Sequence, residues 1–450
     1  MLPLPRLAVG TVQPRADLRS LLWAMIEAMR SKGLQVQSFH SRACFVRHRG
    51  TTTASGTSPR HLDTWLMPPE LCREILVHGA ESCDLALVDG KYADPVANDP
   101  APGGSLDALC EWLDLPRVVV LDVPELSSEG LPLRPERVDA LLMDRVTDRS
   151  HAEHWKARLE EAWGVPVLGA LEWVDPLREE LGAVPSSERP PRDLCQLLGA
   201  FFLRLSQPER LLELACQRPI EWAAPELFAS RDGIPPLVVA LAFDAALDCY
   251  FPDTLDALEA RGATVVDFSP LRGERLPEGT DIVYLGCGHP EQYAEELSQN
   301  HCMKLALRDH LRKGGRIYAE GGGLAYLCQH IALPDGELRR MTGIFPAVAA
   351  LEESRGEPSP LELTLARDTW LGPAGTLLRG YRSPRWEFQP AGALDACVAQ
   401  ASHGHAVVCA GQAIGSQVHL NFAAQPGLLP RFFEPAATRC DPHDPWKAAS

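Results

Sequence analysis

The tract Tyr318-Ala-Glu-Gly-Gly-Gly-Leu-Ala-Tyr326 has the pattern of a turn that presents a reactive side chain, but it carries no nucleophile. Residues 316–318 read as the end of a buried strand, the glycines permit a tight turn, and residues 324–331 read as the first turns of a helix. In a nucleophile elbow, such a turn holds a Ser or Cys at the position of Gly321 or Gly322. Glycine-rich turns are also common in α/β proteins without any catalytic role, so the flanking residues must decide between the two readings.

The elements that position this turn belong to a pattern of alternating strands and helices along most of the chain. Buried strands alternate with helical segments up to about residue 170 and again from Leu237. Because strands separated by helices pair in parallel, this rhythm predicts an α/β fold with mostly parallel sheets covered on both faces. The expected strands are 6–10, 34–39, 85–89, 118–123, 140–146, 167–171, 237–242, 264–268 and 281–285, and the expected helices include 18–31, 194–216 and 254–261.

Two segments rich in Pro, Gly or charge, 175–193 and 218–236, interrupt this rhythm. Domain boundaries fall in such segments because few contacts cross them. We therefore predict a domain over residues 1–190, a helical connection over 191–236 and a second domain over 237–440.

Composition excludes several function classes. The net charge of −17 and the absence of a basic stripe argue against a nucleic-acid or anionic-membrane surface. The chain has no apolar run of about 18 residues, and Pro3 and Pro5 interrupt its first residues, so we expect neither a membrane span nor a signal peptide, and a cytoplasmic protein. Thirteen scattered cysteines without a C-x-x-C pair indicate neither a zinc site nor a disulfide framework, and most should be buried, reduced thiols.

The second half resembles the glutamine amidotransferase domain of the cobyrinic acid a,c-diamide synthase family, a triad-type class I glutaminase. Phe251-Pro-Asp-Thr-Leu-Asp-Ala-Leu-Glu259 is similar to the family's "Y-Y-P-D-N-L-x-x-L-E", and Phe268-Ser-Pro-Leu271 matches its "F-S-P-L". Tyr284-Leu-Gly-Cys-Gly-His-Pro-Glu291 is similar to "Y-L-G-G-G-Y-P-E", and Val418-His-Leu-Asn-Phe422 to "V-H-L-H-F".

The first half resembles the same family's ATP-dependent synthetase domain, more weakly. His61-Leu-Asp-Thr-Trp-Leu-Met67 is similar to "N-L-D-S-W-M-M", Ala86-Leu-Val-Asp-Gly90 falls at a strand ending in "E-G", and Leu141-Leu-Met-Asp-Arg-Val146 is similar to "I-L-N-R-V". The resemblance implies a P-loop-like N-terminal domain and a flavodoxin-like glutamine amidotransferase domain. It also implies cobalamin biosynthesis with ATP, magnesium and glutamine, and a homodimer.

The set of glutaminase residues that the resemblance implies is incomplete in this chain. In the family, a Cys follows the Glu of "Y-A-E-C-G-G-L", and a His acts as its base; here these positions hold Gly321, Glu320 and His419. A glycine offers no thiolate, so glutamine hydrolysis by the usual route should be absent. Cys287, in the family's glycine-rich oxyanion loop, is the one replacement nucleophile that the sequence offers, and its alternative role is as a packed loop residue.

The tract at the expected nucleotide site also departs from the family's motif. The family's "G-T-x-S-x-x-G-K-T-T" loop holds phosphates with amides and a Lys and binds magnesium through a hydroxyl. Here the corresponding tract begins with Gly10 and Thr11, but Asp17 stands at the Lys position. An anion there reverses the sign of a leading interaction with triphosphate. Arg15 and Arg19 could substitute in part as phosphate ligands, or they could be solvated loop and helix charges.

Two acidic positions remain near that site. Asp89 could hold a magnesium ion in place of the family's Glu, or it could cap the following turn. Asp63 is retained, whereas residues 38–46 have lost the family's "K-x-G-P-D-Y-I-D". Binding of ATP and magnesium is therefore doubtful.

The late family motif "G-H-E-F-H-Y-S" reads Gly380-Tyr-Arg-Ser-Pro-Arg-Trp386 in this chain. Arg382 and Arg385 beside aromatic rings would suit a flat, carboxylate-bearing ligand, or they could simply pack.

Three hypotheses follow. The first is a degenerate member that has lost glutaminase and ATP chemistry and binds a corrinoid, another tetrapyrrole or a partner enzyme. The second is a working amidoligase that uses ATP and free ammonia to amidate macrocycle carboxylates. The third is a glutamine sensor, in which Gly288, Glu320 and His419 bind an amide.

Overall fold

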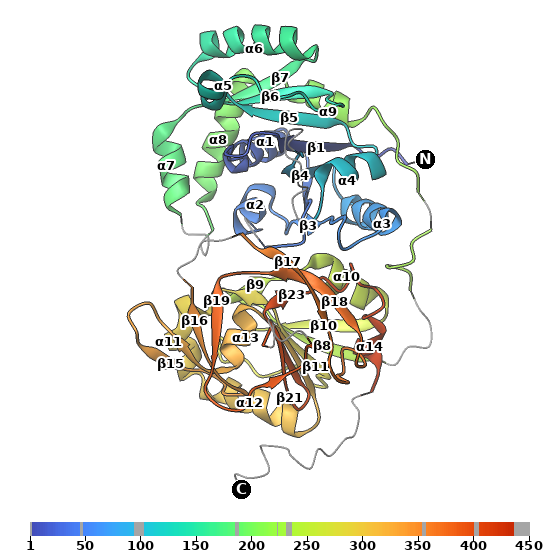
Figure 1. Ribbon diagram of the computed structural model, residues 1–450, viewed down its shortest axis with the longest axis vertical. Helices are drawn as coiled ribbons and strands as arrows, with labels where there is room; N and C mark the ends of the chain where they lie inside the picture. Colours follow the sequence, from blue (N-terminus) through green and yellow to red (C-terminus); the bar gives the residue numbers. More distant parts are fainter. Residues whose placement is uncertain are drawn as a thin grey trace. The chain divides into compact units, whose positions relative to one another are not determined.

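The computed structural model describes residues 2–45, 48–93, 103–184, 189–222, 224–230, 236–352, 357–399 and 405–435. It divides into two units, Met1–Glu226 and Leu227–Ser450, each with its own sheet and helices (Figure 1).

The sheet of unit 1 is a parallel sheet of seven described strands in the order β3-β2-β4-β1-β5-β6-β7. Apolar side chains fill its strands and cover both faces, which explains why they read as continuous hydrophobic runs. The prediction of a parallel α/β sheet is confirmed. The elements of unit 1 are β1 (Arg6–Thr11), α1 (Arg19–Ser31), β2 (Val36–His40), α2 (His48–Ser55), β3 (Arg60–His61), α3 (Pro69–Ala80), β4 (Leu85–Lys91), α4 (Leu106–Trp112), β5 (Arg117–Asp122), α5 (Val123–Glu129), β6 (Ala140–Val146), α6 (Arg149–Trp163), β7 (Val167–Glu172), α7 (Asp175–Ala183), α8 (Arg192–Leu205) and α9 (Pro208–Ala215).

Parallel pairing places the carboxyl ends of these strands along one edge. Asp89 lies opposite Val9 of β1 in the register, and Asp122 of β5 lies opposite Asp144 of β6. The loop from β1 to α1 leaves the sheet at this same edge, so the candidate phosphate-loop residues and the strand-end carboxylates share one region of unit 1.

Helices α8 and α9, which we expected in a connection between domains, supply part of the core of unit 1. Leu198 and Phe202 of α8 and Leu211 of α9 are buried in one cluster with residues of α1. Gly199 lets α8 approach α1 closely, because a Cβ there would lie 3.1 Å from the backbone nitrogen of Ala28. The boundary between the two units therefore lies at residues 226 and 227, after these helices.

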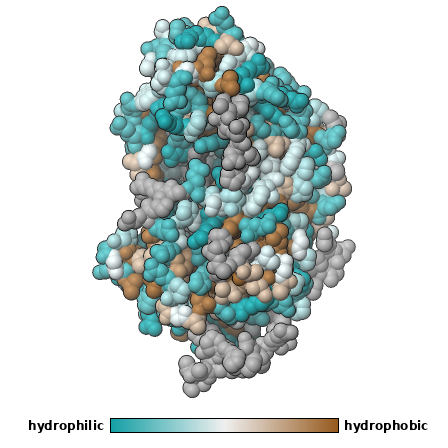
Figure 2. All heavy atoms as spheres, in the orientation of Figure 1, coloured by the Kyte–Doolittle hydropathy of each residue, from teal (hydrophilic) through white to brown (hydrophobic). Residues whose placement is uncertain are grey.

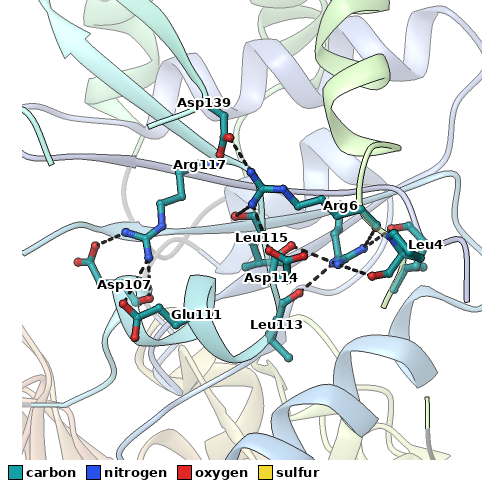
Figure 3. A network of polar contacts seen from close by, with 11 residues as sticks. Leu4, Arg6, Asp107, Glu111, Leu113, Asp114, Leu115, Arg117 and Asp139 are labelled. Atoms are coloured by element: carbon teal, nitrogen blue, oxygen red, sulfur yellow. Dashed lines mark hydrogen bonds and ion pairs between the residues drawn. The ribbon is translucent and has the colours of Figure 1, made fainter. Parts of the chain in front are cut away.

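A buried arginine lies at the amino end of β1, at the opposite end from the strand carboxyl ends (Figure 3). Arg6 of β1 has no solvent exposure and donates to the carbonyl oxygens of Leu4 and Leu113, each at 3.1 Å. It also donates to the carbonyl of Arg218 at 2.5 Å and, more weakly, to that of Pro219 at 3.4 Å. Arg6 thus ties the first strand to the segment that follows α9.

Unit 2 contains a second sheet of seven described strands in the order β10-β8-β11-β13-β22-β21-β20. Strands β10 to β22 pair in parallel, and β21 and β20 extend the sheet in antiparallel fashion, so the expectation of a mostly parallel sheet is confirmed. The elements are β8 (Leu237–Ala242), β9 (Leu247–Cys249), α10 (Pro252–Ala260), β10 (Ala263–Phe268), β11 (Ile282–Leu285), β12 (Cys287–Gly288), the short 3-10 helix η1 (Pro290–Tyr293), α11 (Ala294–Gln299), α12 (His301–Arg312), β13 (Arg316–Glu320), α13 (Gly322–Leu327), β14 (Cys328–Ala332), β15 (Leu338–Arg340), β16 (Phe345–Leu351), β17 (Ser359–Thr364), β18 (Leu377–Arg382), β19 (Trp386–Pro390), β20 (Asp395–Ala396), β21 (Val407–Ala410), β22 (Ala413–Ser416), β23 (Val418–His419) and α14 (Pro430–Phe433).

The helix predicted over residues 324–331 is wrong in its second half. Helix α13 ends at Leu327, and strand β14 begins at Cys328 and pairs with β15 and β16. Cross-strand pairing outweighs the helical pattern of this short apolar run. Three further small sheets in the described part, β12-β9, β15-β14-β16-β19 and β17-β18-β23, were not predicted.

The cysteines follow the prediction with one exception. Seven of the ten free cysteines in the described part are buried. Cys397 and Cys409, however, are joined as a disulfide between the end of β20 and β21, where we expected reduced thiols, because the fold brings together two residues whose spacing carries no motif.

Hydrophilic residues cover most of the face seen in Figure 2, with hydrophobic residues scattered among them. No helix in the described part of the chain is long and apolar enough to cross a membrane.

Candidate functional site

The turn between β13 and α13 has the backbone of a nucleophile elbow. Gly321 lies in the left-handed region with φ of 47°, where residues other than glycine are strained. Its N–H donates to the carbonyl of Ser416 at 3.0 Å, and its carbonyl accepts from the N–H of Ala325 at 3.0 Å. These bonds fix Gly321 between the end of the strand and the first turn of the helix, as the elbow pattern predicts.

Two candidate residues from distant segments meet at Gly321. A Cβ placed on Gly321 would lie 3.1 Å from the Sγ of Cys287 and 3.2 Å from the Nε2 of His419. Both side chains therefore face the point from which the family's nucleophile would project. The space is already filled, because real Cβ atoms are rarely this close to other atoms.

The Cys287 thiol lies beside the elbow. Cys287 lies in β12, opposite Cys249 of β9, and its sulfur lies 3.1 Å from the position that a Cβ on Gly321 would take. Burial, and then the nearby Glu320, raise the pKa of the Cys287 thiol well above its usual range, although the backbone N–H of Gly322 lowers it. In an elbow enzyme, the N–H after the nucleophile stabilises the oxyanion, so here a neutral thiol lies close to that donor.

The remaining groups of this site are uncharged at neutral pH. Burial lowers the pKa of His419 to about 4. Burial raises the pKa of Glu320 to about 8, although the Glu320 carboxyl accepts hydrogen bonds from the Tyr318 hydroxyl at 2.6 Å and the Leu420 N–H at 3.0 Å. Glu320 thus links β13 to the segment that carries His419 and does not act as a free carboxylate.

Arg385 of the late arginine motif forms an ion pair within unit 2. Arg385 donates to Glu291 at 2.5 Å, and the His289 Nδ1 lies 3.3 Å from the same carboxylate oxygen. Burial would raise the pKa of Glu291, but His289 and Arg385 outweigh it and lower that pKa. The structure shows Arg385 in an internal ion pair with Glu291, in the segment between β18 and β19.

In unit 1, the loop from β1 to α1 is joined to the sheet by its own side chains. Gln13 is buried, donates from Nε2 to the carbonyl of Asp122 at 3.2 Å and accepts from the Asp122 N–H at 2.6 Å. Its N–H donates to the Thr11 hydroxyl at 3.1 Å. Gly10 allows close packing, because a Cβ there would lie 2.7 Å from Leu106.

Asp17 takes the position where a helix would receive a phosphate. Its carboxylate accepts from the Arg19 N–H at 3.0 Å, in the first turn of α1, and from the Arg19 guanidinium Nε at 2.7 Å. A helix N-terminus favours an anion, and here the chain provides its own. The Arg15 side chain is 81% exposed and pairs with Glu129 at 3.2 Å, so both arginines of the loop are engaged by carboxylates.

The two acidic candidates behave as structural residues. Asp89 lies 2.6 Å from the Nδ1 of His40, and Asp63 accepts from the N–H groups of Ala43 and Trp65, each at 2.9 Å. The described residues contain no group of three or more His, Cys, Asp or Glu side chains placed to hold a metal ion. The Asp17 carboxylate at the start of α1 would repel a triphosphate, so this loop does not fit the nucleotide that the resemblance implies.

Sequence reasoning missed His40, Gln13, and the Gly322 N–H as parts of these sites. His40 lies at a strand end, in the tract where the family's basic and acidic residues are replaced, which was the available signal. Nothing local signals the other two, because Gln13 meets Asp122 across 109 residues, and the Gly322 contact is made by a backbone group.

Comparison with known proteins agrees with this geometry. Residues 238–426 match the model of the CobB/CobQ-like glutamine amidotransferase domain. The cobyrinate a,c-diamide synthase of Syntrophotalea carbinolica is 29% identical over 96% of this chain and 98% of its own length. The hydrogenobyrinate a,c-diamide synthase of Streptomyces coelicolor is 28% identical, again over 96% and 98%. A crystal structure of a glutamine amidotransferase covers 44% of this chain and 98% of its own, with 16% identity and a TM-score of 0.33. Residues 238–426 therefore carry a CobB/CobQ-like glutamine amidotransferase domain, and the chain is similar over nearly its whole length to cobyrinate and hydrogenobyrinate a,c-diamide synthases.

Proposed function

We propose that this protein is a cytoplasmic, non-catalytic member of its family that has lost glutaminase and ATP chemistry and acts in corrinoid or other tetrapyrrole metabolism. Its role is to bind a macrocycle or a partner enzyme. The observation that carries the proposal is that the chain's own side chains fill both reaction sites, with Cys287 at the elbow and Asp17 at the start of α1.

The elbow supports the loss of glutamine hydrolysis. Attack on an amide carbon requires a thiolate, a base that accepts its proton and donors for the oxyanion. Gly321 supplies no thiolate, and burial raises the pKa of the neighbouring Cys287, which keeps that thiol protonated. Cys287 is therefore a poor replacement nucleophile, because a buried, neutral thiol is unreactive.

The loop of unit 1 supports the loss of nucleotide chemistry. A triphosphate at the start of α1 would meet the Asp17 carboxylate at the position where the family has a Lys. Two like charges at close range repel each other, and the Arg19 guanidinium is already neutralised by Asp17. The same loop cannot release Gln13 without breaking its two hydrogen bonds to Asp122.

A product assay by mass spectrometry tests the proposal. Purified protein is incubated with magnesium-ATP and cobyrinic or hydrogenobyrinic acid, with glutamine in one arm and ammonium in the other. An active family member serves as the positive control, and circular dichroism verifies that the protein is folded. We expect no amide in either arm and binding of the macrocycle in equilibrium dialysis.

Each contrary result would identify an activity that the protein has retained. Amidation with ammonium alone would show a working ATP-dependent amidoligase and overturn the loss of nucleotide chemistry. Amidation with glutamine would show in addition that Cys287 replaces the missing nucleophile. Tight binding of glutamine without ATP would instead favour a sensor that uses the elbow site.

A further inference from the structure

A pocket of about 360 Å³ lies in unit 1, beside the loop that begins α1. The carboxyl ends of β5 and β6 contribute Asp122, Asp144 and Arg145, and helix α7 contributes Arg178 among others. In a parallel α/β sheet, ligands bind outside this edge. Apart from Asp17, Arg15 and Arg19, the residues that line this pocket have no role predicted from the sequence.

Every arginine that lines the pocket is already neutralised by a carboxylate. Arg19 pairs with Asp17 at 2.7 Å, and Arg15 pairs with Glu129 at 3.2 Å. The other two arginines are held by buried strand-end carboxylates, Arg145 by Asp122 and Arg178 by Asp144. The pocket therefore offers no uncompensated cation to an anionic ligand.

Carboxylates, in contrast, remain available. Asp175 and Glu179 of α7 line the pocket, are exposed, and form no ion pair with any residue in the described ranges. Asp122 is only 3% exposed, and while its Oδ2 pairs with Arg145, its Oδ1 has no hydrogen-bond partner within the described structure. A buried carboxylate oxygen without a donor is costly unless a ligand or water supplies one.

An aromatic ring completes the pocket. Trp173 is 37% exposed and lies directly after β7, and the Arg145 guanidinium carbon lies 4.6 Å from its ring centre. Trp23 of α1 also lines the pocket. A planar cation near such rings gains both stacking and electrostatic attraction.

We propose that this pocket binds a small organic cation with a planar amidinium, guanidinium or aromatic ammonium group, in place of a nucleoside triphosphate. The cation would donate to Asp122, stack against Trp173 and be attracted by Asp175 and Glu179. An organic cation fits better than a metal ion, because no cluster of three metal-ligand side chains occurs among the described residues. The proposal concerns unit 1 alone and does not rest on the role in tetrapyrrole metabolism.

Isothermal titration calorimetry of the full chain with benzamidine tests this proposal. Inorganic pyrophosphate and magnesium-ATP serve as anionic probes of similar or larger size. The test variant is Asp175→Asn/Glu179→Gln, which removes two exposed charges without disturbing the core. The matched control is Glu180→Gln, an exposed residue of the same helix that does not line the pocket.

We expect benzamidine to bind the native protein at low salt, and its affinity to fall roughly tenfold in the double variant, equal to about 1.4 kcal/mol. Glu180→Gln should leave the affinity unchanged, and a Trp173→Ala variant should also weaken binding. Equal binding of benzamidine in all variants, no binding at all, or tighter binding of pyrophosphate or magnesium-ATP would overturn the proposal.

Discussion

Reintroducing the family's cysteine at Gly321 should destabilise the protein more when Cys287 is present than when it is absent. A Cβ at Gly321 would lie 3.1 Å from the Cys287 Sγ and 3.2 Å from the His419 Nε2, in a backbone with φ of 47°. The left-handed backbone costs a non-glycine residue about 1–2 kcal/mol. Overpacking of a filled site costs about 1–3 kcal/mol more. The Gly321→Cys variant should therefore lose roughly 2–5 kcal/mol of unfolding free energy, as the sum of these two terms.

A double-mutant cycle separates the two terms. In a Cys287→Ala background, Gly321→Cys should lose only the backbone term, which gives a coupling free energy of about 1–3 kcal/mol between the two positions. Gly279→Cys is the matched control, because Gly279 has φ of 74° and a Cβ there would meet no atom within 4 Å. Urea unfolding of unit 2 measures all five proteins. An equal cost of Gly321→Cys with and without Cys287, or one no larger than that of Gly279→Cys, would refute this reasoning.

Moving the cysteine from position 287 to position 321 also has a chemical readout. The Cys287→Gly/Gly321→Cys variant restores the residue types that the family has at both positions, removes the thiol close to the Gly322 N–H and places a thiol beside His419. We expect this double variant to release glutamate from glutamine, whereas neither single variant should do so. An enzymatic glutamate assay detects the product, and its absence in a folded double variant would show that further residues of the site have been lost.

Further predictions concern the buried charges. Arg6→Met leaves several buried carbonyl groups without a donor and should cost about 3 kcal/mol or more, whereas the exposed Arg15→Met should change the urea midpoint little. Glu320, with its folded pKa raised from 4.5 to about 8, keeps a proton that the unfolded chain has lost, so its contribution to stability should fall as the pH rises from about 4.5 to 8 by up to about 1.4 kcal/mol per unit, and Glu320→Gln should remove this fall. His419, with its folded pKa lowered from 6.5 to about 4, should contribute a loss of stability as the pH falls from about 6.5 to 4. Because Glu320 acts in the opposite direction over most of this range, pH-dependent urea unfolding should show the His419 loss in the Glu320→Gln variant and no such loss when His419→Asn is added. Asp17→Asn removes the negative charge at the start of α1 and should increase pyrophosphate binding in calorimetry; unchanged pyrophosphate binding would contradict the role of this carboxylate.

The strands of both main sheets could be predicted because each is a buried run bounded by turn residues. The predicted 140–146 and 237–242 coincide with β6 and β8. Residues 328–332 could not be assigned in this way, since their strand structure depends on pairing with β15 and β16. Helix α8 was predicted as a helix, but its place in the core of unit 1 depends on its contact with α1, which local sequence does not encode.

The candidate site was predictable only to the level of residue type. The missing nucleophile at Gly321 and the retained His419 can be read from the chain, and the structure brings them together. That Cys287 fills the gap and lies close to the Gly322 N–H depends on how β12 packs against the elbow. The sequence shows an acidic residue at position 17 but not that its carboxylate folds back onto the first turn of α1.

The position of Arg6 has a consequence for how unit 1 forms during synthesis. The first strand leaves the ribosome early, but two of the carbonyls that receive its guanidinium belong to Arg218 and Pro219, more than two hundred residues later. Until that segment emerges, the Arg6 guanidinium lacks two of its carbonyl acceptors, so water must meet part of its hydrogen bonding. The amino end of β1 therefore reaches its final buried environment only after residues 218 and 219 have been synthesised.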